Sequence, residues 1–395
     1  MPEEFLCGTI IPIVKDTCGD CTITSINRPI TLGPVFLQIF ENALLKKFGH
    51  YLTSDDLQFA YKKAHSTAHA HFVLKACVDY YTSNGSNVLV TFLDCSKAFD
   101  TISHYGIFLK LMDRGVPIFF LKLIMYWYLN MKSRVHWEAE FSDYFDVLTG
   151  IKQGGVLSPR IFTLYVDCLI RRLRKAGIGC YLFSFFVACL MYADDLCLIA
   201  PSRGAMQQLL AICEVFCNEF CLSFNVKKSK ALLFGKYDTN LISPLKLNDE
   251  ELDFVDSWKY LGCTIVSGGK FSFSTTSELA AFYASSNSVL RSLRKPNELV
   301  LMNLLYSNCV PNLTYCAEIK ELNSADTNKY NVALNNCIRS IFSYNRWEST
   351  RQLRQQLSFP NISEIFATRR ANFLRKNCES ANHVIRDISR TLLLL

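Results

Sequence analysis

Two apolar stretches of this chain carry carboxylates where a hydrophobic strand is expected to end. Residues 88–93 (VLVTFL) are β-branched and apolar, which predicts a buried strand, and Asp94 follows directly. The chain is also apolar on both sides of Asp194 and Asp195, which predicts a hairpin whose tip exposes carboxylates. Burying unpaired carboxylates at the edge of a hydrophobic strand is costly, and the cost is tolerable where the acids hold divalent cations. Mg²⁺ prefers such oxygen ligands. Each acid taken alone is equally compatible with an ordinary polar turn.

The composition sets outer limits on the fold. The chain has 395 residues, which as a soft prior corresponds to two or three domains. Half of the residues are hydrophobic and 19% are charged, which excludes wholesale disorder. With only 17 Gly and 11 Pro, collagen-like and linker-rich architectures are excluded as well. The net charge of +7 is compatible with a polyanionic partner without requiring one.

The cysteines and the start of the chain predict an intracellular protein that is not secreted. The 17 cysteines are odd in number and several lie in apolar runs, which favours reduced thiols. No hydrophobic leader follows Met1. Cys18 and Cys21 form a CxxC pair without a second pair, and a turn is a better interpretation than a zinc site. The apolar run 178–193 is short for a membrane span and predicts two buried strands, so no membrane contact is expected.

The remaining chain alternates strand and helix patterns before becoming helical. Residues 133–148 alternate like a hairpin, and the strand signals fade after residue 260. Turn residues interrupt one helical stretch at Gly115 and Pro117. Helices are predicted at 33–48, 67–81, 104–131, 159–175 and 202–222, and several more from 276 onward.

Five motifs occur in a fixed order. They are LDCSKAFD (93–100), GIKQGGVLSP (150–159), YADD (192–195), FNVKKSK (224–230) and KYLG (259–262). In type, order and spacing they resemble the palm motifs of the reverse transcriptase domain of non-LTR (LINE-like) retrotransposons.

The resemblance extends beyond these motifs. SINRPITLGPVFLQIFE (25–41) and QFAYKKAHST (58–67) resemble the family's fingers, although Ala60, Tyr61 and Lys62 replace the usual Gly, Phe and Arg. RSIFSYNRWESTRQLRQQL (339–357) resembles the region after the palm.

The resemblance implies an α+β right-hand polymerase fold. Residues 1–87 would form the fingers and 88–270 a palm built on an antiparallel sheet, with a helical insertion on the fingers side at about 104–148. Residues 271–395 would form a helical thumb and C-terminal extension.

The resemblance also implies an activity and its metal ligands. Asp94, Asp194 and Asp195 would hold two Mg²⁺ ions, with Mn²⁺ as the alternative ion. The reaction would be RNA-directed DNA synthesis: transfer of dNMP to a primer 3′-OH, with an RNA template, a DNA or RNA primer and dNTPs as partners. Positioning and charge stabilisation would dominate this catalysis. No oligomeric state is implied.

Residues around the nucleotide follow from the same resemblance. Phe99 would lie under the sugar and exclude a 2′-OH, the group that distinguishes RNA from DNA building blocks. Gln153 and Gly154 would line the dNTP site, where small residues let the backbone approach closely. Without the surrounding motif, Phe99 would be ordinary core packing and 154–155 an ordinary Gly-Gly turn.

The resemblance implicates five lysines at the triphosphate. Lys228 would protonate the leaving pyrophosphate as a general acid, with its neighbours Lys227 and Lys230 as alternatives for the same role. Lys15 and Lys62 would face the triphosphate from the fingers.

The same resemblance assigns the primer grip. Tyr260, Leu261 and Gly262 would form the primer-grip hairpin.

Basic residues cluster twice more. Arg171, Arg172, Arg174 and Lys175 end a predicted helix, where cations are ordinarily favoured. Residues 339–376 hold eight basic residues against two acids, which slightly favours nucleic-acid contacts.

Two other functions remain open at the level of sequence. A catalytically inactive, nucleic-acid-binding remnant is suggested by Ala60, by the Gly-free stretch 183–186 where a hairpin turn is expected, and by the lack of any nuclease-like segment. That lack also suggests a partial reading frame. An RNA-dependent RNA polymerase shares the palm, but Phe99 and YADD argue against it.

Overall fold

The computed structural model describes residues 1–14, 27–236, 243–292 and 297–394, and its centre is a four-stranded antiparallel sheet. The strand order is β11-β3-β10-β9. The strands are β3 (Val88–Leu93), β9 (Cys189–Tyr192), β10 (Asp195–Ala200) and β11 (Lys230–Phe234). All six residues of β3 are buried. A strand covered on both faces needs no polar alternation, which explains its continuous apolar sequence.

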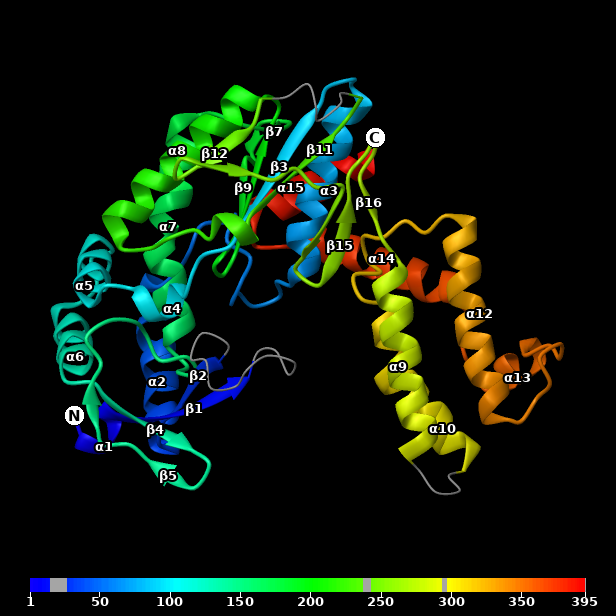
Figure 1. Cartoon of the computed structure of the whole chain (residues 1–395), viewed down its shortest axis with the longest axis horizontal. Coiled ribbons are helices and arrows are strands. Elements are labelled where there is room, and N and C mark those ends of the chain that lie inside the picture. Colours follow the sequence, from blue (N-terminus) through cyan, green and yellow to red (C-terminus); the bar gives the residue numbers. More distant parts are fainter. Residues whose placement is uncertain (15–26, 237–242, 293–296, 395) are drawn as a thin grey trace.

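Three long helices surround this sheet (Figure 1). They are α3 (Thr67–Ser83), α7 (Ser158–Ala176) and α8 (Arg203–Phe220). Helix α3 contacts β3 and β9, whereas α8 contacts β10 and α7. Ser66 and His69 form a capping box at the start of α3, so the helix begins where its first free N–H groups find partners.

A second sheet lies at the N-terminal end of the molecule, at the lower left of Figure 1. Its strands β1 and β4 are parallel although their first residues are 125 positions apart, so the chain returns to the N-terminal strands after passing through β3 and the helices that follow Asp94. The strands are β1 (Cys7–Val14), β2 (Asn27–Leu32), β4 (Lys132–Trp137), β5 (Glu140–Phe141) and β6 (Phe145–Asp146). The helices nearby in the chain are α1 (Glu3–Leu6), α2 (Val35–Phe48), α4 (Ala98–Thr101), α5 (His104–Asp113) and α6 (Ile118–Leu129), together with the 3-10 turn η2 (Gly49–Tyr51).

Short strands complete the sheet structure of the described residues. The pairs are β7 (Tyr181–Leu182) with β8 (Phe185–Phe186) and β12 (Leu245–Leu247) with β13 (Glu250–Leu252), and a three-stranded sheet contains β14 (Ser257–Tyr260), β15 (Cys263–Val266) and β16 (Ser272–Phe273). The β7–β8 turn forms without glycine because Phe183 adopts a φ of 56°. The hairpin expected at 183–186 is therefore present.

The C-terminal third is helical, and Figure 1 shows α9 to α13 as a separate group at the right. Its buried side chains, from Phe282 to Phe366, form a second hydrophobic core. The elements are α9 (Thr276–Ser292), α10 (Glu298–Leu304), the π-helical turn η5 (Leu305–Cys309), α11 (Val310–Leu313), α12 (Ser324–Ile341), α13 (Arg351–Gln356), α14 (Ile362–Cys378) and α15 (His383–Leu394).

Helix α14 connects the two cores. Phe366 belongs to the second core, whereas Phe373 packs with the larger core around the four-stranded sheet. Ile385 and Ile388 of α15 also belong to the larger core. The end of the chain therefore returns to the central sheet. The predicted boundaries at 87 and 270 stay predictions, and α3, inside the predicted fingers range, packs on the central sheet.

Most of the predicted elements are confirmed. Helices occur at each predicted range, and the break at 115–117 separates α5 from α6. The run 178–193 contains β7, β8 and β9 rather than a helix. Across the described ranges, no helix combines the length and apolar character that a membrane crossing requires.

Candidate active site

The strand register brings the predicted metal-binding acids together. Leu93 of β3 pairs with Leu196 of β10. Asp94 follows Leu93 and Asp195 precedes Leu196, so both acids lie at the same end of neighbouring antiparallel strands. Asp194 occupies the turn beside them. Residues 100 positions apart in the sequence thus form one carboxylate cluster.

The turn that carries Asp194 is strained. Tyr192 pairs with Asp195, which leaves Ala193 and Asp194 as a two-residue loop. Ala193 has a φ of 56°, a left-handed conformation that is uncommon for residues other than glycine. Such strain persists only where surrounding contacts hold it in place.

Gln58 supplies these contacts. Its side chain is fully buried; its Nε2 donates to the Ala193 carbonyl at 3.1 Å and its Oε1 accepts from the Ala193 N–H at 2.9 Å. The backbone of Leu57 and Phe59 bonds both polar groups of Met191, so this segment lies along the free edge of β9. Gln58 is the first residue of the motif QFAYKKAHST, and this position is the one sequence feature that could have indicated its role.

The carboxylates repel one another in a partly buried setting. Burial, reinforced by Asp194 and Asp94, raises the pKa of Asp195 to about 6. Burial also raises the pKa of Asp194, with Asp94 adding to the effect and Arg28 of β2 opposing it. Within the described ranges, no ion pair involves any of the three acids. Three neighbouring carboxylates that form no ion pair in the described ranges are the kind of donor set that Mg²⁺ takes.

The motif FNVKKSK is fixed against the end of β3. The Asn225 N–H donates to the Asp94 carbonyl at 2.8 Å, and the Asp94 N–H donates to Ser229 Oγ at 3.2 Å. The Ser229 hydroxyl donates in turn to the Asn225 carbonyl at 2.8 Å. This closed set of bonds sets the position of the lysine-bearing turn, η3 (Val226–Lys228), relative to Asp94.

The three candidate lysines differ in surroundings. Lys228 lines a cavity of about 210 Å³ together with Asp94 and Asp195. Lys227, which is exposed like Lys228, does not line that cavity. Lys230 forms an ion pair with Asp253 at 2.5 Å. Of the three, Lys228 is the one that shares a cavity with the acids.

The residues expected around the nucleotide also converge. The Phe99 ring stacks on Phe162 with centroids 4.4 Å apart. Gln153 Nε2 donates to Asp100 Oδ1 at 2.8 Å, and the Gln153 carbonyl accepts from Thr31 of β2 at 2.7 Å. The motif GIKQGG therefore bridges the segment after Asp94 and the N-terminal sheet.

Gly154 lies in this bridge and has no room for a side chain. Its φ is 119°, and a Cβ there would lie 2.8 Å from the Thr31 carbonyl oxygen. Both the backbone conformation and the close approach require glycine.

Of the two lysines predicted to face the triphosphate, Lys62 is bonded to another segment. Lys62 Nζ donates to the Asp55 carbonyl at 2.5 Å, and burial lowers its pKa. Lys15 lies outside the described residues, as do Cys18 and Cys21. Two other side chains of the predicted fingers range interact electrostatically with Asp194: Arg28 opposes the rise in the pKa of Asp194, and burial together with Asp194 raises the pKa of Tyr61. Sequence analysis assigned neither a role.

The predicted primer-grip residues form a tight hairpin turn beside the acids. Tyr260 pairs with Cys263, and the two loop residues Leu261 and Gly262 have φ of 43° and 84°. Tyr260 is buried against Phe92 of β3, with ring centroids 4.6 Å apart.

The turn is held from the helical third. Tyr315, which follows α11, bonds the Leu261 carbonyl through its hydroxyl at 3.0 Å, and the hydroxyl of Thr67 at the same distance. A Cβ on Gly262 would lie 2.8 Å from the Tyr315 ring, so glycine lets the two segments approach. Nothing in the sequence indicated Tyr315.

Most basic side chains of the first cluster form ion pairs with acids of this chain. Arg171 pairs with Asp167, Arg172 with Glu219 and Arg174 with Asp55. In the second cluster, Arg369 donates to the Thr314 carbonyl and Arg370 pairs with Glu321. Arg351 and Arg354 of the same cluster line a cavity of about 720 Å³ near α13.

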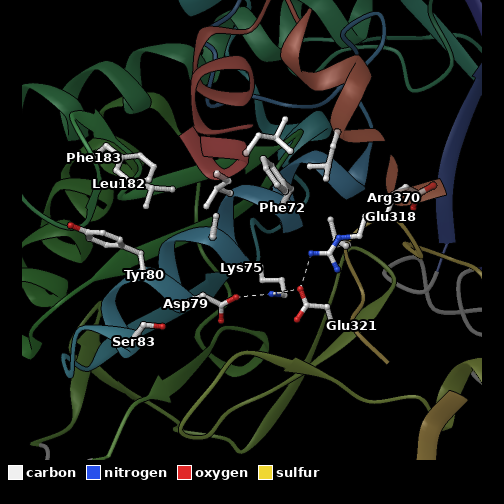
Figure 2. A pocket seen from close by; sticks show the side chains of 15 residues that line it. Phe72, Lys75, Asp79, Tyr80, Ser83, Leu182, Phe183, Glu318, Glu321 and Arg370 are labelled. Atoms are coloured by element: carbon white, nitrogen blue, oxygen red, sulfur yellow. Dashed lines mark hydrogen bonds and ion pairs between the residues drawn. The ribbon is translucent and has the colours of Figure 1, made fainter. Parts of the chain in front are cut away.

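A cavity of about 420 Å³ lies away from the acids, between α3 and the C-terminal helices (Figure 2). Its charged groups satisfy one another: Lys75 pairs with Asp79 at 2.6 Å and with Glu321 at 3.4 Å, and Arg370 pairs with Glu321 at 2.9 Å. None of the three clustered acids lines it. Its charges are therefore arranged as a structural network.

The chain is similar to known proteins over most of its length. A family model described as "Reverse transcriptase (RNA-dependent DNA polymerase)" matches residues 16–265. A Pol polyprotein from the retrotransposable element R2 of Nasonia vitripennis is 28% identical over 251 residues, which cover 61% of this chain and 24% of that protein. The RNA-directed DNA polymerase from the mobile element jockey of Drosophila melanogaster is 22% identical over 99% of this chain and 43% of its own length.

A solved structure shares the fold. Telomerase from Candida tropicalis, in complex with a fragment of telomeric RNA, matches with a TM-score of 0.50 at 10% identity, covering 99% of this chain and 65% of that one. The predicted fold class, an α+β right-hand polymerase, is confirmed. The chain spans about a quarter to less than half of the length of the two curated relatives.

Proposed function

Because this chain belongs to the reverse transcriptase (RNA-dependent DNA polymerase) family, with relatives among LINE-like retrotransposon polymerases, we propose that it synthesises DNA on an RNA template. The substrates are dNTPs and a DNA or RNA primer, and the reaction transfers dNMP to the primer 3′-OH. The observation that carries this proposal is the register of β3 and β10, which gathers Asp94, Asp194 and Asp195 at one edge of the sheet.

Asp94, Asp194 and Asp195 are the residues that would hold divalent ions. They suit two Mg²⁺ because they are oxygen donors at the same end of paired strands and have no ion-pair partner among the described residues. Bound Mg²⁺ would supply charge stabilisation on the attacking and leaving oxygens of an in-line displacement, and Mn²⁺ suits the same ligands. The protein itself contributes rigidity: Gln58 holds the turn that carries Asp194, and Asn225 and Ser229 hold Asp94.

The other site residues divide the remaining tasks. Lys228 shares the cavity of Asp94 and Asp195, and acts as the acid that protonates the leaving pyrophosphate. Phe99 is held flat by Phe162 and excludes the 2′-OH of a ribonucleotide. Gln153 and Gly154 line the nucleotide site, and Tyr260 to Gly262 position the primer end.

We extend the proposal to the subdomains and the nucleic acid. Residues 1–87 act as fingers, 88–270 as palm and 271–395 as thumb and extension. Arg351 and Arg354, next to the α13 cavity, contact the phosphates of the duplex. Lys62 donates to the Asp55 carbonyl and reaches the triphosphate only after that hydrogen bond breaks. Arg28, which already acts electrostatically on Asp194, is better placed to contact the triphosphate.

The test is primer extension on an RNA template with dNTPs and Mg²⁺. We expect cDNA from the parent protein and a loss of about 10³-fold or more in Asp194→Asn, since charge stabilisation carries most of the catalysis. Asp249→Asn is the matched control. Asp249 is exposed in the β12–β13 turn with a φ of 62°, a conformation that asparagine also accepts.

Two alternatives give different results in the same assay. An inactive remnant would bind primer–template with a steep salt dependence but extend nothing, so parent and Asp194→Asn would behave alike. An RNA-dependent RNA polymerase would extend with rNTPs in preference to dNTPs. Two of the sequence features behind the remnant hypothesis have structural explanations: Ala60 has no positive φ, so glycine is not needed there, and Phe183 makes its turn unaided.

A further inference from the structure

Behind the primer-grip hairpin, three buried side chains converge from three separate elements. They are His71 of α3, Cys263 of β15 and Cys316, which follows α11. One ring nitrogen and the two sulfur atoms all lie within 4.8 Å of one another. In the described part of the chain, no other group of three or more His, Cys, Asp or Glu residues meets this distance. Imidazole and thiolate are ligands that zinc prefers in proteins.

His71 is the second, independent sign of a ligand. Its side chain is 0% exposed, and neither ring nitrogen has a hydrogen-bond partner outside the cluster. Its other neighbours are apolar faces: the rings of Tyr260 and Phe273 contact it edge-on at 5.3 and 5.6 Å. A buried polar group without a partner is rare and destabilises the folded protein. Coordination by one ring nitrogen removes that cost.

The charge balance of the region also fits a divalent ion. Two thiolates and a neutral imidazole carry a charge of −2 and would neutralise one divalent cation. The nearest buried cation, Lys320, is already paired with Glu278 at 2.5 Å. A divalent ion that displaced the two thiol protons on binding would itself be the charge partner of the sulfur atoms.

We propose that His71, Cys263 and Cys316 form a Zn²⁺ site that fastens the primer-grip hairpin to helix α3 and to the helical third of the chain. The fourth position of the tetrahedron is left for a water molecule. The site lies beside a hydrogen-bonded junction of the same three segments, since Thr67 is one helical turn before His71, and Leu261 and Tyr315 closely precede the two cysteines. Zinc and these hydrogen bonds fix one geometry of the hairpin.

The direct test is metal content. Protein purified in the presence of Zn²⁺ and passed through a desalting column should contain about one zinc per chain by elemental analysis. Cys18 and Cys21 are a competing thiol pair, so the measurement is made on the Cys18→Ser/Cys21→Ser variant, in which the zinc should remain. Replacing zinc with Co²⁺ should give the intense visible bands of a tetrahedral site and a sulfur-to-cobalt charge-transfer band.

Single substitutions locate the ion. Cys263→Ser and Cys316→Ser should each lose the zinc and weaken the charge-transfer band, and His71→Ala should lose the zinc. The matched control is Cys213→Ser on α8, an equally buried thiol outside the cluster, which should keep both. Because a substituted core can fail to fold, the stoichiometry and cobalt spectrum of the protein with the cluster intact stand as an independent readout.

Three results would overturn the proposal. One is the absence of stoichiometric zinc or cobalt in protein with an intact cluster. Another is zinc that persists in folded Cys263→Ser and Cys316→Ser. The third is a Cys263–Cys316 disulfide, found by mass spectrometry of protein alkylated without reduction, in place of the metal. None of these readouts depends on polymerase activity, so this site and the proposed function can fail separately.

Discussion

Gln58 and Ala193, 135 residues apart, form a closed pair of hydrogen bonds in which the side-chain amide of Gln58 satisfies both backbone groups of Ala193. Ala193 is the residue that holds a left-handed conformation directly before Asp194. The amide therefore stabilises the strained turn and, through it, the position of a metal-binding carboxylate.

Gln58→Ala should impair catalysis more than binding. Losing the clamp frees the turn, and small misplacements of a reacting group can cost about 10²-fold in rate. We expect kcat for primer extension to fall by about 10–100-fold with little change in the affinity for primer–template. Stability should fall by about 1–3 kcal/mol because three buried backbone groups, two of Ala193 and the N–H of Ala60, lose their partner.

Gln207 provides the control for that substitution. Its amide makes the same pair of bonds to the backbone of Lys246, at 2.8 and 3.0 Å, but on the outer side of the central sheet in α8. Gln207→Ala should lower stability slightly and leave kcat unchanged. If the two variants lost activity equally, the clamp would have no specific role at the turn.

Asp195→Asn should stabilise the protein when no divalent ion is added. Burial and the neighbouring acids raise the folded-state pKa of Asp195 from 3.8 to about 6, so the folded protein holds a proton that the unfolded chain has released. Stability therefore falls as pH rises from about 4 to about 6. At pH 7 the variant should exceed the parent by about 1–3 kcal/mol in urea unfolding, with the difference vanishing near pH 4.

Added Mg²⁺ should reverse this order. An ion bound by the acids stabilises the folded parent by mass action, whereas the variant has lost a ligand. A parent that is no less stable than Asp195→Asn at pH 7 without Mg²⁺ would contradict the assigned repulsion. Asp249→Asn, in an exposed turn, should show neither effect.

The helices and strands that depend on local sequence pattern could be predicted. The run VLVTFL, the acids after it and the helical periods are all local signals, and β3, the β9–β10 hairpin and the long helices appear where they predict. The motif order placed Asp94, Asp194 and Phe99 in one family pattern. None of that required knowledge of long-range contacts.

The contacts between distant segments could not be predicted in this way. Gln58 meets Ala193, Tyr315 meets Leu261, and His71 meets two cysteines only because the strands and helices pack in one arrangement. No periodicity links residues 50 to 250 positions apart. The C-terminal helix likewise gives no local sign that it returns to the larger core.

Lys228→Ala should reduce kcat more than the same change at Lys227. Both lysines are exposed, but only Lys228 lines the cavity of Asp94 and Asp195. General acid catalysis contributes about 10²–10⁴-fold, so a loss of about 10²-fold is expected for Lys228→Ala and less than about threefold for Lys227→Ala. Single-turnover extension with saturating dNTP measures this. Equal losses would move the assignment away from Lys228.

Phe99→Val should relax the choice of sugar. The ring stacks on Phe162 at 4.4 Å, so its plane is fixed, and removing it opens space where a 2′-OH would lie. We expect the ratio of dNTP to rNTP incorporation to fall by about tenfold or more. Phe99→Tyr keeps the ring and should keep the ratio. A ratio unchanged in Phe99→Val would make Phe99 a packing residue only.

Tyr315→Phe should loosen the primer end without unfolding the chain. Its hydroxyl joins the Leu261 carbonyl to Thr67 at 3.0 Å each, and the ring that packs on Gly262 is retained. The substitution removes both bonds; the one to the Leu261 carbonyl, which bears on the primer end, is worth about 1 kcal/mol and corresponds to about a fivefold rise in the KM for primer–template. Tyr306→Phe, an exposed tyrosine that packs on Phe359, is the control and should leave the KM unchanged. A Tyr315→Phe protein with lower thermal stability but the parent KM would restrict this tyrosine to a structural role.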